Sequence, residues 1–280
     1  MPEVNFYGIK TDPPTKSIAQ AFNSEMQPTL LLGGQKTTYV SGNIVLKPTN
    51  DITYSNWIAE TFKVLPESPT LRFARPIKSI NGTWVHQGYV AWSFLKGRHV
   101  KGQYDKKIAA SLEFHKLLKN ISKPDFLGTP TSSWSTADLV AWQKLDFNYD
   151  KEFMELYNQI KPHLKPLKLP SQLVHGDISG NFLFEPGLPP AIIDFSPAWA
   201  PNLFSEGIML TDAITYEKAE PEELEVFKTI PNFGQFAWRG VLRRITEQPE
   251  HIKWLNKDKS QAIKEAREFQ KAIDYLKLNY

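Results

Sequence analysis

The spacing of apolar residues changes along the chain and divides it into two parts. In the first third, short apolar runs are separated by turn residues, as in segments 29–32, 39–41 and 44–47. The last two of these runs are joined by Gly42-Asn43, a dipeptide typical of hairpins. From residue 104 onward, apolar residues recur at a spacing of three to four, which predicts amphipathic helices.

The helical pattern also allows individual helices to be placed. We expect helices over the following segments: 15–23, 54–65, 105–120, 135–143, 151–164, 204–216, 221–228, 233–246 and a long one over 259–278. Ser55, Asp105, Ser135 and Asp150 are the expected N-caps, with Ser135 and Asp138 spaced as in a capping box. Strands followed by helices predict an α+β fold, with a small antiparallel β lobe and a larger, mainly helical lobe.

Composition narrows the class of protein. The chain has 280 residues, of which 41% are apolar and 22% charged, as in an ordinary globular protein. A net charge of +3 without a basic run does not indicate a nucleic-acid partner. The absence of cysteine excludes disulfides, thiolate catalysis and cysteine-bound zinc. No signal pattern and no long apolar run are present, so we expect a cytoplasmic protein that does not span a membrane.

Polar residues with a chemical character gather in segment 173–197. Two short apolar strands, 182–184 and 191–193, are joined by a turn rich in Pro and Gly. Asp177 and Asn181 precede the first strand, and Asp194 follows the second. A hairpin would bring these side chains to one end, where their oxygens suit Mg²⁺ and a spare carboxylate can orient or deprotonate a hydroxyl.

This segment resembles the catalytic loop and metal motif of aminoglycoside phosphotransferases and choline kinases, which share the protein-kinase-like fold. The matching residues are His175-Gly176-Asp177, Asn181 and Ile193-Asp194-Phe195. The resemblance implies that Asp177 is the catalytic base and that Asn181 and Asp194 bind Mg²⁺. Within the superfamily the chain is most similar to a small-molecule-kinase-like group with the motif H-G-D-x-[ST]-G-N.

One spacing departs from the family pattern. Asn181 follows Asp177 by four residues, whereas the usual pattern places the asparagine five residues on. The shorter loop leaves two possibilities open, a different placement of Asn181 on the metal or a contribution from Ser179. His175 is expected to brace the loop through hydrogen bonds, and His115 is expected to be a packing residue.

The resemblance also implies a nucleotide-binding role for the first lobe. Gly33 and Gly34 allow close backbone approach, and Thr37 and Thr38 offer donors to phosphate oxygens. Lys47 would hold the α- and β-phosphates of ATP; without the downstream motif it would be read as an exposed lysine at a strand end.

A lysine in that role needs an acidic partner on the next helix, where Glu60 is the only acid in segment 54–65. One apolar stripe, Ile58, Phe62 and Leu65, faces away from Glu60, whereas another, Trp57, Thr61 and Val64, would turn it inward. The alternative is a solvated glutamate.

The resemblance further places a hinge after the last strand of the first lobe. Backbone groups of Ala91, Trp92, Ser93 and Phe94 would read the adenine edge. The lobes would then be residues 1–95, which cover the nucleotide, and residues 96–280, which carry the catalytic loop and the metal site.

Two further acidic features lie downstream of the metal motif. Five glutamates form a run that could attract a cationic substrate or could simply favour a helix N-terminus: Glu217, Glu220, Glu222, Glu223 and Glu225. Asp212, on a predicted helix, could orient the catalytic loop, but a structural role is expected.

These features together predict a kinase that uses ATP and Mg²⁺ to phosphorylate a hydroxyl of a small molecule. A pseudokinase-like nucleotide-binding scaffold and a metal-dependent hydrolase using His175, Asp177 and Asp194 are the alternatives. The sequence fixes neither the acceptor nor the choice between ATP and GTP, nor the oligomeric state.

Overall fold

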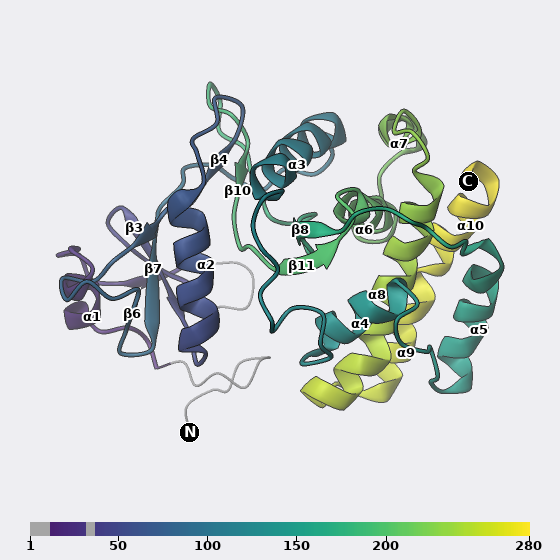
Figure 1. The fold of residues 1–280 in the computed structure, drawn as a ribbon, viewed down its shortest axis with the longest axis horizontal. Coiled ribbons are helices and arrows are strands. Elements are labelled where there is room, and N and C mark those ends of the chain that lie inside the picture. The colour runs from purple at the N-terminus through teal and green to yellow at the C-terminus, as the bar shows by residue number, and fades with distance from the viewer. Residues whose placement is uncertain (1–11, 32–36) are drawn as a thin grey trace. The chain divides into compact units, whose positions relative to one another are not determined.

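A computed structural model describes residues 12–31 and 37–280. The chain divides into two compact units, Met1–Gly97 and Arg98–Tyr280, each with its own core (Figure 1). Among the described residues, no helix combines the length and the apolar character needed to cross a bilayer.

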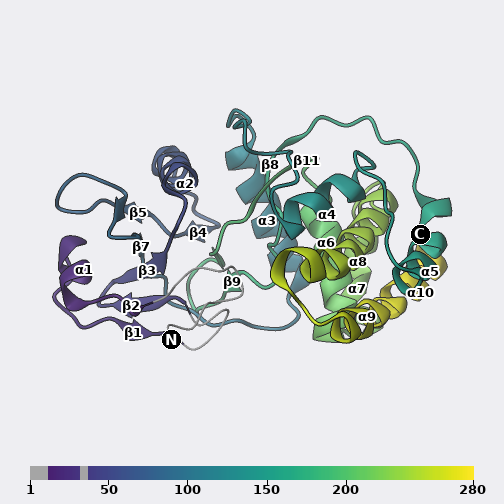
Figure 2. The same ribbon diagram turned by 90° about the horizontal axis from the view of Figure 1, so that it is seen from below.

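The first unit is built on an antiparallel sheet. Its strands are β1 (Thr29–Leu30), β2 (Tyr39–Ser41), β3 (Ile44–Pro48), β5 (Pro76–Ile77), β6 (Val85–His86) and β7 (Tyr89–Ser93). The order is β1-β2-β3-β7-β5, with β6 also paired to β7. Figure 2 shows β1, β2 and β3 side by side. A further short strand, β4 (Arg72–Phe73), lies outside this sheet.

Two helices cover opposite faces of this sheet, because alternate residues of β7 point in opposite directions. Tyr89 and Ala91 join a core cluster with Ile18 of α1 (Lys16–Ala21). Trp92 faces the other way, and its ring meets that of Phe62 on α2 (Ile52–Val64) at 5.5 Å.

The second unit is mainly helical. Its helices are α3 (Tyr104–Leu118), α4 (Ser133–Ala141), α5 (Lys151–Ile160), α6 (Phe204–Asp212), α7 (Pro221–Lys228), α8 (Gly234–Leu255), α9 (Lys259–Glu268) and α10 (Gln270–Asn279). A short 3-10 helix, η1 (Lys161–His163), follows α5, and a π-helix, η2 (Ala213–Glu217), follows α6. Two small antiparallel pairs complete the unit: β8 (Gln172–His175) with β11 (Pro197–Ala200), and β9 (Phe182–Leu183) with β10 (Ala191–Ile192).

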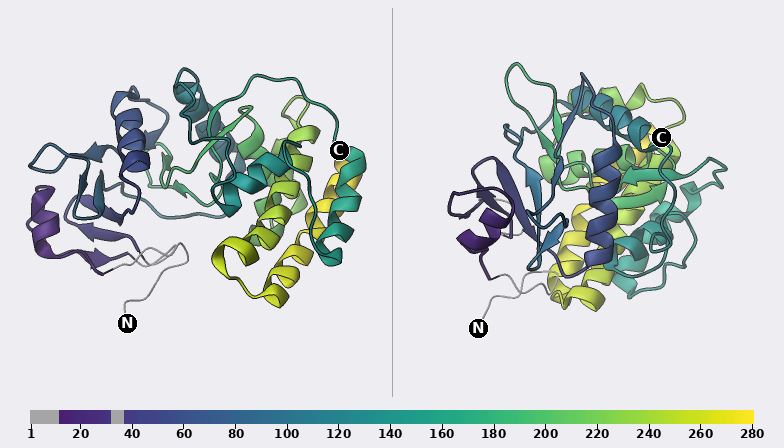
Figure 3. Two further views of the ribbon diagram at one scale, coloured as in Figure 1. Left: turned by 60° about the horizontal axis from the view of Figure 1, so that its bottom comes forward. Right: turned by 60° about the vertical axis from the view of Figure 1, so that its left-hand side comes forward.

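Helix α8 runs through the middle of this unit, shown in yellow-green in Figure 3. It packs against α6 backbone to backbone. A Cβ added at Gly207 would lie 2.1 Å from the carbonyl oxygen of Phe236, and one at Gly240 would lie 2.2 Å from backbone atoms of Gly207. Both positions therefore require glycine, and the close crossing brings the backbone of α6 against the N-terminal half of α8.

The predicted α+β class is confirmed, but several helix boundaries were wrong. Helix α2 is capped by Asp51, whose Oδ1 accepts from the amide of Tyr54 at 2.8 Å, and not by Ser55. Helix α3 starts after Gln103 rather than at Asp105. The capping box of α4 joins Ser132 and Ser135, one turn earlier than the predicted pair.

The predicted C-terminal helix is in fact two. It breaks at Phe269, which ends α9 and begins α10. The phenylalanine is fully buried, so packing of its ring fixes the break.

Candidate active site

The site is built on the loop that follows β8. His175 ends the strand and is fully buried. Its Nδ1 accepts from the amide of Asp177 at 3.2 Å, which leaves Nε2 to donate to the carbonyl of Ile193 at 3.2 Å. The amide of His175 donates to Nε2 of His115 at 3.1 Å. His175 therefore braces the loop as predicted, and His115 is a buried packing residue that also holds the loop.

Gly176 lets the loop lie close to the neighbouring strand. Its amide donates to the carbonyl of Ser196 at 2.7 Å, and a Cβ added to it would lie 3.0 Å from the Cβ of Ala198. A larger residue at this position of the H-G-D motif would crowd Ala198. Glycine therefore allows the catalytic loop to hydrogen-bond to the segment that follows Asp194.

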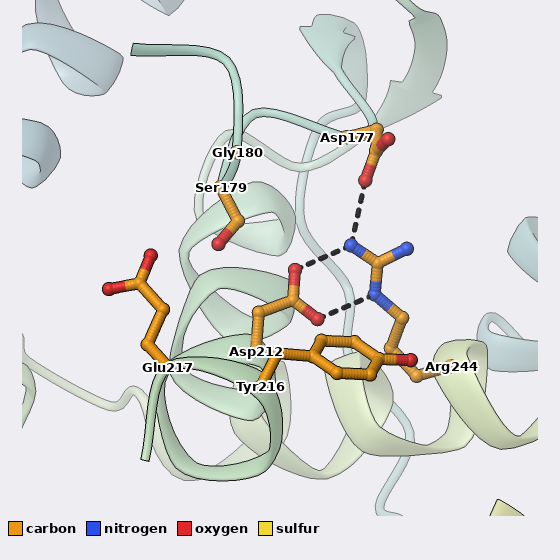
Figure 4. Close-up of a pocket in the computed structure, with 7 residues that line it drawn as sticks. All are labelled: Asp177, Ser179, Gly180, Asp212, Tyr216, Glu217 and Arg244. Atoms are coloured by element: carbon orange, nitrogen blue, oxygen red, sulfur yellow. Dashed lines mark hydrogen bonds and ion pairs between the residues drawn. The ribbon is translucent and has the colours of Figure 1, made fainter. Parts of the chain in front are cut away.

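Asp177 lines a cavity of about 260 Å³ within the second unit. Its side chain is 39% exposed. The cavity is bounded by the catalytic loop, η2, the C-terminal end of α6 and the middle of α8 (Figure 4). Its lining residues are Asp177, Ser179, Gly180, Asp212, Tyr216, Glu217 and Arg244.

Arg244 of α8 lies between Asp177 and Asp212 (Figure 4). Its Nη2 donates to Oδ1 of Asp177 at 2.7 Å and to Oδ2 of Asp212 at 2.5 Å, and its Nε donates to Oδ1 of Asp212 at 2.8 Å. Burial alone would raise the pKa of Asp177, but the guanidinium groups of Arg244 and Arg243 together outweigh it and lower that pKa to about 2. Asp177 is therefore ionised at neutral pH.

The network continues behind Arg244. Glu247 accepts from Nη1 of Arg244 at 3.1 Å and is also paired with Nη1 of Arg243. Arg243 in turn donates from Nε to Asp138 of α4 at 3.1 Å. These buried charges satisfy one another and join α4, α6, α8 and the catalytic loop.

The proposed metal ligands lie at one end of the β9–β10 hairpin. The amide of Ile193 donates to the carbonyl of Asn181 at 3.0 Å, so Asn181, directly before β9, and Asp194, two residues after β10, lie at the same end of the hairpin. Nδ2 of Asn181 donates to the carbonyl of Asp177 at 2.6 Å, which assigns Oδ1 as the remaining ligand atom. Asp194 is exposed and has a left-handed backbone, with φ of 53°.

This donor set fits Mg²⁺. Two protein oxygens are enough for a magnesium ion that takes its other ligands from phosphate and water. Among the described residues there is no group of three or more His, Cys, Asp or Glu side chains that could hold a metal without such help.

The residues predicted to contact the nucleotide belong to the first unit. Gly33 and Gly34 lie outside the described residues. Thr38 accepts from the amide of Leu31 at 2.9 Å through its carbonyl, and Thr37 precedes it just before β2. Lys47 lies on β3 opposite Val90 of β7.

The predicted hinge residues belong largely to the sheet. Ala91, Trp92 and Ser93 are part of β7. The amide of Ser93 donates to the carbonyl of Arg75, and that of Phe94 donates to the carbonyl of Asn43, both at 2.8 Å. The donors of these two residues are thus already used within the unit.

Glu60 lies on the more exposed side of α2. The buried stripe is the one with Ile58 and Phe62, and the side chain of Glu60 is 53% exposed. Its carboxylate accepts from the indole of Trp84 at 2.7 Å, which lowers the pKa of Glu60, and it lies 3.8 Å from the ammonium of Lys63. Its pairing with Lys47 stays a prediction.

Of the five glutamates in the acidic run, one lines the cavity. Glu217 lines it but accepts hydrogen bonds from the amide of Gly102, the hydroxyl of Tyr104 and the ammonium of Lys107. Glu220 and Glu223 form the capping box of α7, as the helix-terminus interpretation predicted. The run is therefore mostly structural.

Two lining residues were missed from the sequence, Arg244 and Tyr216. A signal for Arg244 existed: Arg243-Arg244 interrupts an apolar run, between Leu242 and Ile245, in a predicted helix. Tyr216 carried no such signal, because its place depends on the π-turn of η2.

Comparison with known proteins identifies the family. The model of the phosphotransferase enzyme family matches residues 65–241, which is more than half of the chain. The chain belongs to this family. The matched range contains Asp177, Asn181 and Asp194, whereas Lys47 and Glu60 precede it. No curated protein matches the chain in sequence.

Several solved structures share the fold of this phosphotransferase-family chain. Spectinomycin phosphotransferase APH(9)-Ia in its AMP-bound complex has a TM-score of 0.60 and 14% identity, over 94% of this chain and 98% of that one. Amicoumacin kinase hAmiN, in complex with AMP-PNP, Ca²⁺ and Ami, has a TM-score of 0.60 and 15% identity over 92% of both chains. Choline kinase LicA from Streptococcus pneumoniae has a TM-score of 0.60 and 13% identity, over 94% and 97%. The predicted bilobal, protein-kinase-like α+β fold is thereby confirmed.

Proposed function

We propose that this protein is a phosphotransferase that moves the γ-phosphate of ATP to a hydroxyl group of a small molecule. The observation that carries the proposal is the ionised carboxylate of Asp177 lining a cavity of about 260 Å³, on the same short loop as Asn181. A cavity of this size suits a small molecule, or one ring of a larger one.

Asp177 would act on the acceptor hydroxyl. The hydroxyl oxygen forms a new bond to the γ-phosphorus, the bond from that phosphorus to the bridging oxygen breaks, and ADP leaves with the electron pair. A carboxylate whose pKa is lowered to about 2 is a weak base. Its main role is therefore to orient the hydroxyl and to receive the proton late in the transfer, when that proton has become acidic.

Asn181 and Asp194 would hold Mg²⁺ through Oδ1 and the carboxylate. When bound, the ion neutralises charge on the phosphates. The contact between Nδ2 of Asn181 and the carbonyl of Asp177 spans the short loop and keeps Oδ1 available as a ligand.

Lys47 would hold the nucleotide phosphates, with Thr37, Thr38, Gly33 and Gly34 covering them. The adenine would be read beyond β7. Since the amides of Ser93 and Phe94 are engaged in the sheet, we place this contact on carbonyls of 91–94 or on backbone groups of the irregular segment 95–97.

The known relatives in fold support this assignment through what they bind. Their structures contain AMP, AMP-PNP with Ca²⁺, or ADP with spectinomycin. Each of these structures thus contains a nucleotide. One also contains a divalent cation, and one contains spectinomycin, a small organic molecule.

We favour this proposal over the two alternative functions. A hydrolase using His175 would need a ring nitrogen for metal or water, but both nitrogens are engaged within the loop and the residue is fully buried. The scaffold hypothesis relied on the short loop between Asp177 and Asn181. In this loop the side chain of Asn181 still contacts the carbonyl of Asp177.

Asp177→Asn tests the proposal, because it keeps the size of the side chain and removes its charge. We expect ADP release to fall about 10²- to 10⁴-fold while ATP affinity, measured by calorimetry, stays within about twofold. Asp146→Asn, at an exposed aspartate between α4 and α5, is the matched control. Unchanged ADP release by Asp177→Asn would refute the assignment of Asp177.

A further inference from the structure

Arg244 is a buried cation whose hydrogen bonds can be counted completely. A guanidinium has five N–H groups. Nε donates to Asp212, Nη1 donates to both oxygens of Glu247, and the two N–H groups of Nη2 match Asp212 and Asp177. Every donor has a carboxylate partner, so no N–H remains for a phosphate.

Four of the five donors anchor the guanidinium to the helical unit. Asp212 is bidentate from the end of α6, and Glu247 lies one turn further along α8. Glu247 is itself fixed by Arg243, which Asp138 holds from α4. The fifth donor, an N–H group of Nη2, is therefore held in a fixed position where it binds Asp177.

Asp177 is held at three points. Its amide is bound by Nδ1 of His175, its carbonyl by Nδ2 of Asn181, and its Oδ1 by Nη2 of Arg244. In the part of the chain that the structure describes, no hydrogen bond reaches Oδ2. One carboxylate oxygen is thus immobilised and the other is left for a hydroxyl.

We propose that Arg244 is a positioning residue, which fixes the rotamer of the Asp177 carboxylate so that Oδ2 points to the acceptor hydroxyl. This inference rests on the proposed phosphotransferase function and assigns to α8 a part in it. Although Arg244 lines the cavity, its N–H groups are taken by carboxylates, so its effect on the reaction is exerted through Asp177.

The geometry requires arginine. Lysine keeps the charge but has one nitrogen, which cannot reach Asp212, Glu247 and Asp177 together in a planar arrangement. Arg244→Lys therefore separates the positioning role from the charge. Arg239→Lys is the matched control: Arg239 is also buried on α8, but it binds Gln235 and the carbonyl of Lys165, away from Asp177.

The experiment measures ADP release with water as acceptor, together with the ATP dissociation constant, for the full chain. We expect Arg244→Lys to lower kcat about 10- to 100-fold, with KM for ATP and the dissociation constant within about twofold. Arg239→Lys should match the wild type. Added guanidinium ion should partly restore kcat in Arg244→Ala but not in Asp177→Asn.

A second variant distinguishes the loss of positioning from a folding defect. Asp212→Asn keeps Arg244 and the shape of the site while removing one anchor, so it should retain the melting profile and lower kcat about 10-fold, again with ATP affinity unchanged.

The possible outcomes are distinct. If the wild type binds no ATP and releases no ADP, the proposed function fails and this inference with it. An active wild type with unchanged kcat in Arg244→Lys and Asp212→Asn overturns the inference alone. Loss of ATP affinity in Arg244→Lys overturns it too, because that result would assign Arg244 to the phosphates.

Discussion

Asp177 and Asp212 share one arginine, yet their pKa values move in opposite directions. Burial raises the pKa of Asp212 to about 6 even though Arg244 opposes it, and the neighbouring carboxylates of Asp177 and Glu247 act in the same direction as burial. At Asp177 the guanidinium groups of Arg244 and Arg243 together outweigh burial and lower the pKa to about 2. Exposure differs in the same sense, since the side chain of Asp212 is 7% exposed and that of Asp177 is 39% exposed. Asp177, the more exposed of the two carboxylates, is the one that we propose acts on the acceptor hydroxyl.

Glu206 gives a residue-scale prediction for stability. It is fully buried beneath the loop, where Oε1 accepts from Ser111 at 2.5 Å, and burial raises its pKa to about 7. Between pH 4.5 and 7 the unfolded chain loses this proton while the folded chain keeps it. The contribution of Glu206 to the free energy of unfolding should therefore fall by about 3 kcal/mol as the pH rises through this window, and level off above it.

Urea unfolding at several pH values measures this effect. Glu206→Gln should reduce the slope by the contribution of Glu206 and leave that of Asp212, whose pKa is also raised, to about 6. Glu155→Gln, on the exposed side of α5, should keep the full slope. A slope that persists unchanged in Glu206→Gln would show that another group causes it.

At the scale of elements, local pattern predicted which segments are helical but not how they pack. Segment 204–216 was expected as one helix, but it ends at Asp212 and continues as the π-turn η2, which brings Tyr216 and Glu217 to the cavity. A π-turn shifts the register by about one residue, which apolar spacing cannot show. Likewise α8 continues through Pro249 to Leu255, beyond the predicted end at 246, because tertiary packing buries it.

The glycine crossing of α6 and α8 gives the element-scale prediction. Gly240→Ala would place a methyl group 2.2 Å from backbone atoms of Gly207, so the helices must separate. We expect a loss of about 3 kcal/mol or more in the free energy of unfolding. ADP release should fall as well, because Asp212 and Arg244 lie beyond the crossing on these helices.

Gly234→Ala is the control for this change, since a Cβ there meets only ordinary contacts with Tyr280 at 3.4 Å. Chemical denaturation compares the two variants. Equal stability of Gly240→Ala and Gly234→Ala would contradict the backbone contact.

At the scale of the whole molecule, the part of the site that could be predicted is the part that is local in sequence. His175, Asp177, Asn181 and Asp194 lie within one segment of twenty residues, on a loop and the hairpin that follows it, so their spacing already indicated their proximity. Arg244 binds Asp177 across 67 positions of sequence; the interrupted apolar run of α8 marks an unusual arginine there but does not indicate which residue it binds. The nucleotide-binding roles of the first unit remain predictions for a different reason, because they depend on a bound ligand.

Calorimetric titration of ATP into the protein, with and without Mg²⁺, tests the central claim most directly. We expect Mg²⁺-dependent binding that Lys47→Ala and Asp194→Ala each weaken about tenfold or more, a loss of about 1.4 kcal/mol, while Lys119→Ala, at an exposed helix end, leaves it unchanged. The absence of binding by the wild-type protein, with or without Mg²⁺, would contradict the assignment of this chain as an ATP-dependent phosphotransferase.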